Sequence, residues 1–482
     1  MKLSFVLLAV GCWLSTVLAQ WEPDQRLTND PGSSKTAECS NTWTVAAAGD
    51  TVHVVWTDDR DGNDEIYYKS STDGGASWGG DQRLTNADHR SWCPSAAVAG
   101  ATVHVVWEDN RDVDWYDVYY KRSTDGGASW SDDLKLSTTG LAFGPSVAVV
   151  GDTVHVVWDG LLSDTVGRPL EIYYARSTDA GATWDSVARL TSDSADYAWQ
   201  PSVAAAGSGI HVAWYDGRNG PAFPAEVYYK RSTDNGVTWG SDVRLTNTAP
   251  SSEWVSIAAA DGRVHVVWTD ARDGAYEIYY KRSTDNGATW PSSPQGDTRL
   301  TPPDGHTSYF PSIAAAGANV HVVWTDTRDG GTGEVYYKSS TDGGATWSSD
   351  TGLSFKDSKQ SLHPSIAVAG SGLHVAWYDN RDGNNETYYK RNPTGGVGIG
   401  AGRKPQATSS GQSATIVGCV LNLQSATCNL QSEVVLLNAT GRKVLDLHEG
   451  ANDVSRPSPG VYFVQSSPAN RHFSVAKVIV LR

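Results

Sequence analysis

Short apolar runs recur along this chain with a period of about 54 residues, and the period repeats seven times. In its most regular form each copy has a small-residue run ending in Ala-x-Gly, an alternating Val-His-Val-Val-Trp run, a Glu-Ile-Tyr-Tyr-Lys run and a short Arg-Leu-Thr segment. The tryptophans that end the second run are Trp56, Trp107, Trp158, Trp214, Trp268, Trp324 and Trp377. Short runs rich in β-branched and aromatic residues, separated by Gly, Asp and Asn, are typical of β-strands. Four strands in each tandem copy predict the blades of a β-propeller.

The two ends of the repeat array predict how the propeller closes. The seventh copy ends at residues 388–391 without a fourth strand, whereas residues 24–28 have the sequence of one, Asp-Gln-Arg-Leu-Thr. If residues 25–28 pair with residues 386–390, the ring closes and no sheet edge stays exposed. We therefore predict an all-β fold, a seven-bladed β-propeller of four-stranded blades over residues 20–394, with this N-terminal strand as its clasp.

Six copies carry an eight-residue box, Ser-Thr-Asp-x-Gly-x-Ser/Thr-Trp, between the third and fourth predicted strands. Its aspartates are Asp73, Asp125, Asp179, Asp234, Asp285 and Asp342. The boxes resemble those of the sialidase-like Asp-box (BNR) repeat superfamily, and the resemblance extends over residues 21–391. The carboxylate can accept hydrogen bonds from turn amides, the glycine allows a positive φ, and the tryptophan can pack onto the blade. We expect the boxes to be structural and to lie on the face opposite the ligand-binding loops.

Two further repeated features contain metal-ligand residue types. The second strands carry one histidine each: His53, His104, His155, His211, His265, His321 and His374. One histidine per blade is too dispersed to share an ion, so we expect hydrogen-bonded core residues. The Asp-x-Arg-Asp-Gly loops after the second strands resemble calcium loops, but an arginine stands where an oxygen ligand is needed. We favour an Arg–carboxylate bracket, leave calcium binding open, and predict no cofactor and no metal site.

Aromatic residues that interrupt the repeat cluster in the predicted loops of one face. They form a predicted collar around the channel mouth: Trp43, Trp92, Trp115, Phe143, Trp199, Trp254, Tyr309 and Phe310. Trp92, Phe143, Trp199 and Tyr309 each lie two residues before a first-strand proline. Aromatic rings beside polar groups suit stacking on sugar rings, and the alternative is that these rings plug the channel.

The ligand-binding candidates combine collar residues with arginines of the second-to-third loops. They are Trp92, Phe143, Trp199, Trp254, Tyr309, Arg111, Arg218 and Arg272. The second-to-third loops of the third and fourth copies, at residues 159–164 and 220–224, depart most from the repeat. We therefore expect the site to lie toward the third and fourth blades.

The sialidase resemblance does not extend to catalytic residues. Sialidases have six blades and a Phe/Tyr-Arg-Ile-Pro motif, which this chain lacks, and its first strands contain no arginine, so we assign no catalytic residue. Three functions remain: a carbohydrate-binding propeller, which we favour; an exo-acting glycoside hydrolase of sialidase type; and a non-catalytic protein-interaction scaffold. The hydrolase would need a carboxylate pair from acids of the top loops: Asp193, Asp196, Glu253 and Asp304.

The two ends of the chain predict export. Residues 1–19 have the features of a signal peptide, namely Lys2, an apolar run and Val-Leu-Ala before Gln20. The Gly-, Ser- and Thr-rich residues 395–413 predict a linker. Residues 414–482 predict a small Ig-like β-sandwich, whose Pro-Gly-Val-Tyr-Phe-Val and terminal Lys-Val-Ile-Val-Leu-Arg segments resemble the C-terminal sorting domain of the type IX secretion system. The resemblance implies the outer-membrane secretion machinery as a partner and a secreted or surface-attached protein; an ordinary Ig-like accessory domain is the alternative.

The net charge limits the classes of partner, and the cysteines raise the separate question of disulfide pairing. A formal net charge of −16 argues against nucleic acid and anionic membranes, and no later apolar run is long enough to span a bilayer. A glycan is the expected partner and a monomer the expected state. Cys39 and Cys93 fall in equivalent loops of adjacent copies, so an inter-blade disulfide and free buried thiols are both open, as is the state of Cys419 and Cys428.

Overall fold

The chain divides into two compact units in the computed structural model, Met1–Ile399 and Gly400–Arg482. The structure describes residues 21–36, 43–112, 115–138, 141–161, 170–191, 197–219, 225–248, 251–330 and 332–395, and the strand backbones between residues 414 and 480. Every regular element in these described residues is a β-strand. Within them, no helix exists that is long and apolar enough to cross a membrane.

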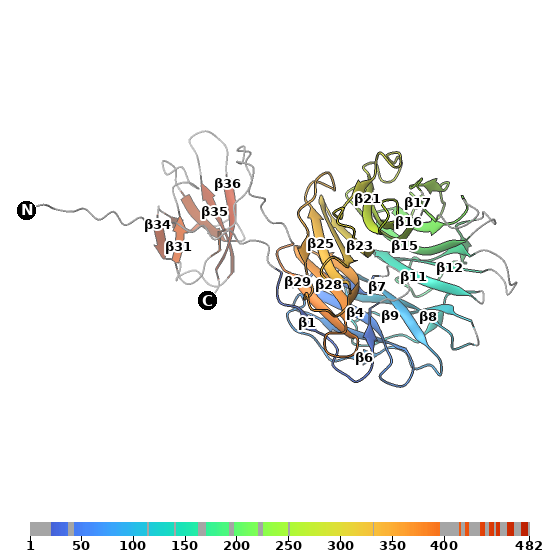
Figure 1. The fold of residues 1–482 in the computed structure, drawn as a ribbon. Helices are drawn as coiled ribbons and strands as arrows, with labels where there is room; N and C mark the ends of the chain where they lie inside the picture. The colour runs from blue at the N-terminus through green and yellow to red at the C-terminus, as the bar shows by residue number, and fades with distance from the viewer. Residues whose placement is uncertain are drawn as a thin grey trace, which may run out of the picture. The chain divides into compact units, whose positions relative to one another are not determined.

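The first unit is a ring of seven antiparallel sheets, which confirms the seven-bladed propeller (Figure 1). The first strands of neighbouring blades contact one another and line the central channel, so they are the innermost strands. From the innermost to the outermost strand, the blades are β3 (Val45–Ala48), β4 (Thr51–Asp58), β5 (Glu65–Ser71) and β6 (Gln82–Arg83); β7 (Ser91–Ala99), β8 (Thr102–Asp109), β9 (Asp117–Ser123) and β10 (Leu134–Lys135); β11 (Ala142–Val150), β12 (Thr153–Gly160), β13 (Glu171–Ser177) and β14 (Ala188–Arg189); β15 (Ala198–Ala206), β16 (Gly209–Asp216), β17 (Glu226–Ser232) and β18 (Val243–Arg244); β19 (Ser252–Ala260), β20 (Arg263–Asp270), β21 (Glu277–Ser283) and β22 (Thr298–Arg299); β23 (Ser308–Ala316), β24 (Asn319–Asp326), β25 (Glu334–Ser340) and β26 (Thr351–Gly352); and β27 (Ser361–Ala369), β28 (Gly372–Asp379), β29 (Glu386–Asn392) and β1 (Gln25–Arg26).

The clasp is formed as predicted. Strand β1 pairs antiparallel with β29, with Gln25 opposite Tyr389 and Arg26 opposite Tyr388, and in Figure 1 the blue β1 lies beside the orange β29. Trp21 also packs edge-on against Tyr337, with ring centroids 5.0 Å apart, as each box tryptophan does against a tyrosine of the preceding blade. The N-terminal segment therefore supplies both the fourth strand and the box tryptophan that the seventh copy lacks.

Blade one departs from the predicted repeat at its innermost strand. The short strand β2 (Ser34–Lys35) pairs with the end of β4, while β3 pairs with its beginning. Residues 36–44 separate these two pieces, so the innermost strand of this blade is split. As a result, Lys35 takes the register position that Trp92 takes in blade two, opposite the residue that follows the second-strand tryptophan.

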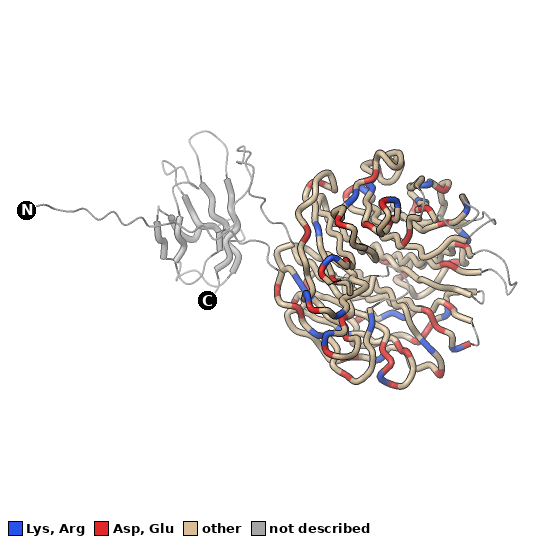
Figure 2. Tube along the Cα trace, viewed as in Figure 1, with Lys and Arg blue, Asp and Glu red and all other residues tan. Residues whose placement is uncertain are grey.

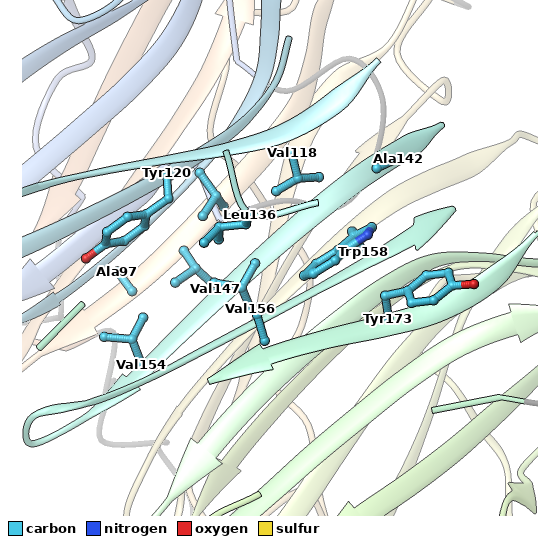
Figure 3. Packing of buried hydrophobic residues seen from close by; sticks show 12 residues of the cluster. Ala97, Val118, Tyr120, Leu136, Ala142, Val147, Val154, Val156, Trp158 and Tyr173 are labelled. Carbon is cyan, nitrogen blue, oxygen red and sulfur yellow. The ribbon is translucent and has the colours of Figure 1, made fainter. Parts of the chain in front are cut away.

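The core lies between the blades, where the side chains of one sheet meet the next. The seven second-strand tryptophans are 0–1% exposed. Figure 3 shows one such region, where Tyr120 and Leu136 of blade two face Val147, Val156 and Trp158 of blade three. A packed layer between every two blades makes each blade dependent on both neighbours.

The seven second-strand histidines are core residues, as predicted. Each Nδ1 is hydrogen-bonded to a third-strand tyrosine hydroxyl of its own blade, for example His104 to Tyr120 at 2.8 Å and His321 to Tyr337 at 2.9 Å. Burial lowers the pKa of every one of these histidines to about 4. The neutral form is therefore the one that the folded propeller accommodates.

The boxes join neighbouring blades. In blade two, the Asp125 carboxylate accepts hydrogen bonds from the Ser123 hydroxyl and the Ser129 amide, which closes the hairpin. Gly127 has a φ of 92° and lies directly against the Tyr68 hydroxyl of blade one. The box amide of Gly126 donates to Ala101 in the hairpin between the first and second strands, so the boxes lie on the face of those hairpins.

We expect Gly127→Ala to destabilise the propeller far more than Gly126→Ala. Both glycines have a positive φ, so both substitutions carry a backbone cost of about 1–2 kcal/mol. A methyl group at position 127 would also overlap the Tyr68 hydroxyl, whereas position 126 has open space around it. Overlap in a packed interface adds roughly 1–3 kcal/mol. Thermal denaturation of the two variants measures the difference, and equal melting temperatures would contradict the proposed blade contact.

The second unit contains seven described strands in two sheets. Strands β30 (Ala414–Thr415), β36 (Ser474–Val480), β35 (Gly460–Ser466), β32 (Val434–Asn438) and β33 (Lys443–Leu447) form one sheet in that order. Strands β31 (Val420–Leu423) and β34 (Gly450–Asp453) form the other. The backbone of this region is thus all-β, as expected from the sequence.

Candidate functional site

Seven residues, one from each blade, occupy equivalent positions near the start of the innermost strands. Each pairs with the residue that follows the second-strand tryptophan. We call them the inner ring: Lys35, Trp92, Phe143, Trp199, Glu253, Tyr309 and Leu362. Because they share one register, they surround the channel at one level, on the face opposite the boxes.

A β-bulge follows the inner ring in six blades. The register shifts between Trp92 and Ser95 in blade two, and at the same place in the next five blades. The residues at the bulge have φ values between 45° and 57°: Cys93, Gly144, Gln200, Trp254, Phe310 and His363. Large side chains such as those of Trp254 and Phe310 are strained in this conformation, and such strain clusters at functional sites.

The bulges bring partly exposed aromatic side chains together at this face. We call six of them the rim: Trp92, Phe143, Trp199, Trp254, Tyr309 and Phe310. Tyr116 lies between Trp92 and Phe143, with ring centroids 5.3 Å and 5.6 Å away. Trp254 contacts Phe310 at 4.9 Å, and Phe310 contacts Tyr309 at 4.7 Å. Aromatic contacts therefore run along the rim across neighbouring blades.

Two tryptophans of the predicted collar are not part of the rim. Trp43 lines the channel and packs against the apolar cluster between blades five and six, across the ring from its own blade. It lies inside the channel, as the alternative interpretation of the collar predicted for all these rings. Trp115 is 48% exposed in the second-to-third loop of blade two. The channel cavity measures about 220 Å³ and, apart from Trp43, its lining is alanine and valine.

The three candidate arginines lie away from the rim, against the outer strands. Arg111 Nε donates to Asp109 at 2.8 Å, and its Nη1 donates to Asp133, just before outer strand β10, at 2.6 Å. The guanidinium group also stacks on Tyr119. Arg218 and Arg272 form the same bracket with Asp216 and Asp242 and with Asp270 and Asp297. The bracket prediction is confirmed, and it accounts for these guanidinium groups without a ligand.

Charged side chains elsewhere in the propeller also lie mainly away from the inner ring. Figure 2 shows acidic and basic residues mainly in loops and at strand ends, with long uncharged stretches of strand between them. Two carboxylates, Glu108 and Asp159, are exceptions, because they lie in second strands directly opposite inner-ring residues. Glu108 is 1% exposed and Asp159 is 2% exposed.

Glu108 and Asp159 were missed by sequence reasoning. Each accepts a hydrogen bond from the bulge amide of the next blade, from Gly144 at 2.7 Å and from Gln200 at 3.0 Å. Burial raises the pKa of Glu108 to about 7, and burial together with the charge of Glu108 raises the pKa of Asp159 well above its usual range. The signal was present at the position after the second-strand tryptophan, where other copies have threonine or tyrosine.

The structure places two of the four acids considered for a catalytic pair. Glu253 is a member of the inner ring and is partly buried. Asp304 lies exposed in a loop, 3.9 Å from Arg328. Asp193 and Asp196 lie outside the described residues. Of the two alternatives for Cys93, the structure shows the disulfide-bonded form. Cys39, the partner considered from the sequence, lies outside the described residues.

Comparison with known proteins agrees with this architecture. A complex of an ulvan lyase of polysaccharide lyase family PL25 with -[GlcA(1-4)Rha3S]- is 14% identical, with a TM-score of 0.55, over 76% of this chain and 95% of that one. The same type of lyase without ligand gives 13% identity and a TM-score of 0.52 over 74% and 93% of the two chains. A protein of unknown function from Dyadobacter fermentans is 14% identical, with a TM-score of 0.48, over 77% and 98%. At these identities the likeness to the two lyase structures shows the fold alone.

The sequence itself identifies the family. No curated protein matches the chain. Residues 57–322 and 152–376 match the BNR repeat-like domain, and together these segments run from blade one to blade seven. The matched residues include the box-bearing hairpins and the second strands that form the blade cores. The chain therefore belongs to the BNR repeat-like domain family.

Proposed function

We propose that this propeller binds carbohydrate at the rim. The observation that carries the proposal is the row of partly exposed aromatic side chains that strained bulges hold around the channel mouth. Flat apolar rings beside polar groups are well suited to stacking on the faces of pyranose rings. Clusters of exposed apolar side chains on one face usually mark a binding surface.

Filling the channel does not require the rim residues. Trp43 already lies in the channel, and alanine and valine side chains line the rest. Trp199 instead stacks on Tyr197, which is 38% exposed, with ring centroids 5.0 Å apart. The six rim residues are partly exposed, as a saccharide platform requires.

Binding is better supported than hydrolysis. Most glycoside hydrolases need a pair of carboxylic groups that the substrate can reach. Glu108 and Asp159 have raised pKa values, but both are enclosed and both hold a bulge amide. The ulvan lyase of similar fold was solved with a bound disaccharide unit, which is in keeping with carbohydrate as the ligand class.

We expect Trp92→Ala and Trp199→Ala to weaken glycan binding with little change in melting temperature. A stacked ring contributes on the order of 1–2 kcal/mol, or about tenfold in affinity. Trp115→Ala is the matched control, because Trp115 is exposed on the same face but outside the rim, and it should bind as the wild type does. Titration with glycans selected on an array, alongside thermal denaturation, separates the outcomes. A large loss of stability with no glycan bound by the wild type would make these rings core residues.

We further propose that the chain is exported and that residues 414–482 direct it across the outer membrane. The proposal is supported by the signal-peptide features of residues 1–19 and by the sorting-domain resemblance at the C-terminus. A chain that lacks residues 414–482 should remain in the periplasm of a host with a type IX system, with the propeller folded. Immunoblots of periplasm and medium measure this, and full export of the truncated chain would rule the proposal out.

A further inference from the structure

Glu253 is the only acidic residue of the inner ring. Trp92, Phe143, Trp199 and Tyr309 fill the same register position in four other blades. The bulge that follows Glu253 places Trp254 at a φ of 51°, and Trp254 packs against Tyr276 with ring centroids 5.6 Å apart. Glu253 therefore lies within the rim, at the side that blades four and five form.

The carboxylate of Glu253 is partly buried and has no ion-pair partner in the part of the chain that the structure describes. Ser251 donates a hydrogen bond to it, and no lysine, arginine or histidine among the described residues forms an ion pair with it. Burial raises its pKa, and its charge adds to the effect of burial in raising the pKa of Tyr215 and of Tyr276. Glu253, Tyr215 and Tyr276 thus form one electrostatic group.

The fold does not require a carboxylate at this position. Blades two, three, four, six and seven form the same bulge with an aromatic residue or leucine in place of Glu253. Removing a carboxylate from water without a cation is unfavourable. A polar ligand that hydrogen-bonds to the carboxylate offsets that cost.

The surroundings of Glu253 carry the same sign of charge. Asp159 acts on Tyr215 from the blade-three side and is itself not paired with a cation among the described residues. The cations that the structure describes at this level belong to other blades. Lys35 is in blade one, and Arg90, which stacks on Trp92, is paired with Asp64 at 2.5 Å. Two carboxylates therefore lie at this level in blades three to five: Glu253, which is partly exposed, and Asp159, which is enclosed behind the rim.

We propose that Glu253 is the polar residue that contacts the saccharide at the rim. This site then binds neutral or amino sugars in preference to anionic ones. A carboxylate accepts hydrogen bonds from sugar hydroxyls and attracts a sugar ammonium group. The negative charge of a uronate, sialate or sulfate group would be repelled by this carboxylate. The repulsion alone makes the site selective against anionic glycans. The inference rests on the proposed function, since it names the ligand class of the same site.

The test is a glycan array probed with the purified full chain, followed by titration. The probes are chitotetraose and its de-N-acetylated form, and tetragalacturonate and its methyl ester, printed beside sialylated and sulfated glycans. We expect binding to the neutral or amino probes at least about tenfold tighter than to the anionic ones, or about 1.4 kcal/mol. Glu253→Gln should reduce this ratio to about threefold or less, at an unchanged or higher melting temperature. Asp304→Asn, which removes a charge from an exposed loop, should leave the ratio as in the wild type.

The outcomes distinguish the two proposals. Tightest binding to anionic glycans overturns the inference and leaves carbohydrate binding standing. An unchanged ratio in Glu253→Gln, with wild-type folding, assigns the discrimination to other residues and also overturns it. Absence of binding to every glycan on the array overturns both proposals.

Discussion

Lowering the pH from 7.5 to 4 is expected to unfold the propeller. The seven second-strand histidines have pKa values of about 4 in the folded state, because burial disfavours their charged form. In an unfolded chain the histidine pKa is about 6.5. Between pH 6.5 and 4 the unfolded state therefore binds more protons than the folded state, and the free energy of unfolding decreases as the pH is lowered. Each histidine contributes up to about 3 kcal/mol of this loss.

Buried carboxylates oppose the effect without cancelling it. Burial raises the pKa values of Glu108 and Glu277 to about 7 and that of Asp159 well above its usual range, so these groups favour the folded state as the pH falls. The stability gained by these three carboxyl groups as the pH falls is smaller than the stability lost by the seven histidines. The net loss is on the order of 10 kcal/mol, comparable with the whole stability of a typical domain.

Denaturant unfolding at a series of pH values between 7.5 and 4 measures this dependence. His321→Gln is the informative variant, because burial is the only cause of the lowered pKa of His321 and glutamine can still bond to Tyr337. The variant should lose roughly 3 kcal/mol less than the wild type over the range. Parallel stability curves for the two proteins would show that the histidines do not carry the acid sensitivity.

Deleting residues 21–28 should cost the propeller most of its stability. Glu386 is buried and receives a hydrogen bond from Thr28 at 2.5 Å and an ion pair from Arg26, so the deletion leaves a buried charge without partners. That alone costs roughly 3–5 kcal/mol. The loss of the Trp21 contact with Tyr337 adds a cost of similar size, and β29 becomes an exposed edge.

Size-exclusion chromatography and thermal denaturation should show aggregation or early melting of the deletion variant. Gln25→Ala is the matched control, because it keeps the backbone pairing with β29 and removes only the side-chain hydrogen bond from Gln25 to the Gly75 carbonyl. It should melt only slightly below the wild type, since one neutral hydrogen bond contributes about 1 kcal/mol. A synthetic peptide of residues 20–28 should restore the melting temperature of the deletion variant by pairing with β29. A monomer with unchanged melting would show that the clasp does not stabilise the ring.

The blades and the clasp could be predicted because they depend on patterns that repeat. Residues 21–28 even match residues 78–85 at Trp, Asp-Gln-Arg and Leu-Thr, so the origin of the missing box tryptophan was readable in the chain. The split innermost strand of blade one has no such precedent in the other copies. Trp43 therefore resembled a collar residue, although the structure places it in the channel.

The site was only partly predictable because it depends on contacts between blades. The aromatic rim could be anticipated, since its residues interrupt the repeat. Glu108 and Asp159 could not be assigned a role, because each is completed by an amide of the following blade. Likewise, the register shift that makes Glu253 part of the inner ring appears only once β19 is paired with β20.

The clasp also sets the order of assembly. Thr28 and Glu386 are separated by 358 positions, so the first strand of the propeller to be synthesised is the last to find its partner. Until β29 exists, the first blade and the growing seventh side both present open sheet edges. Closure of the ring is thus a long-range step late in folding, and we expect the clasp to be the junction at which a mechanical load or a protease first opens the folded ring.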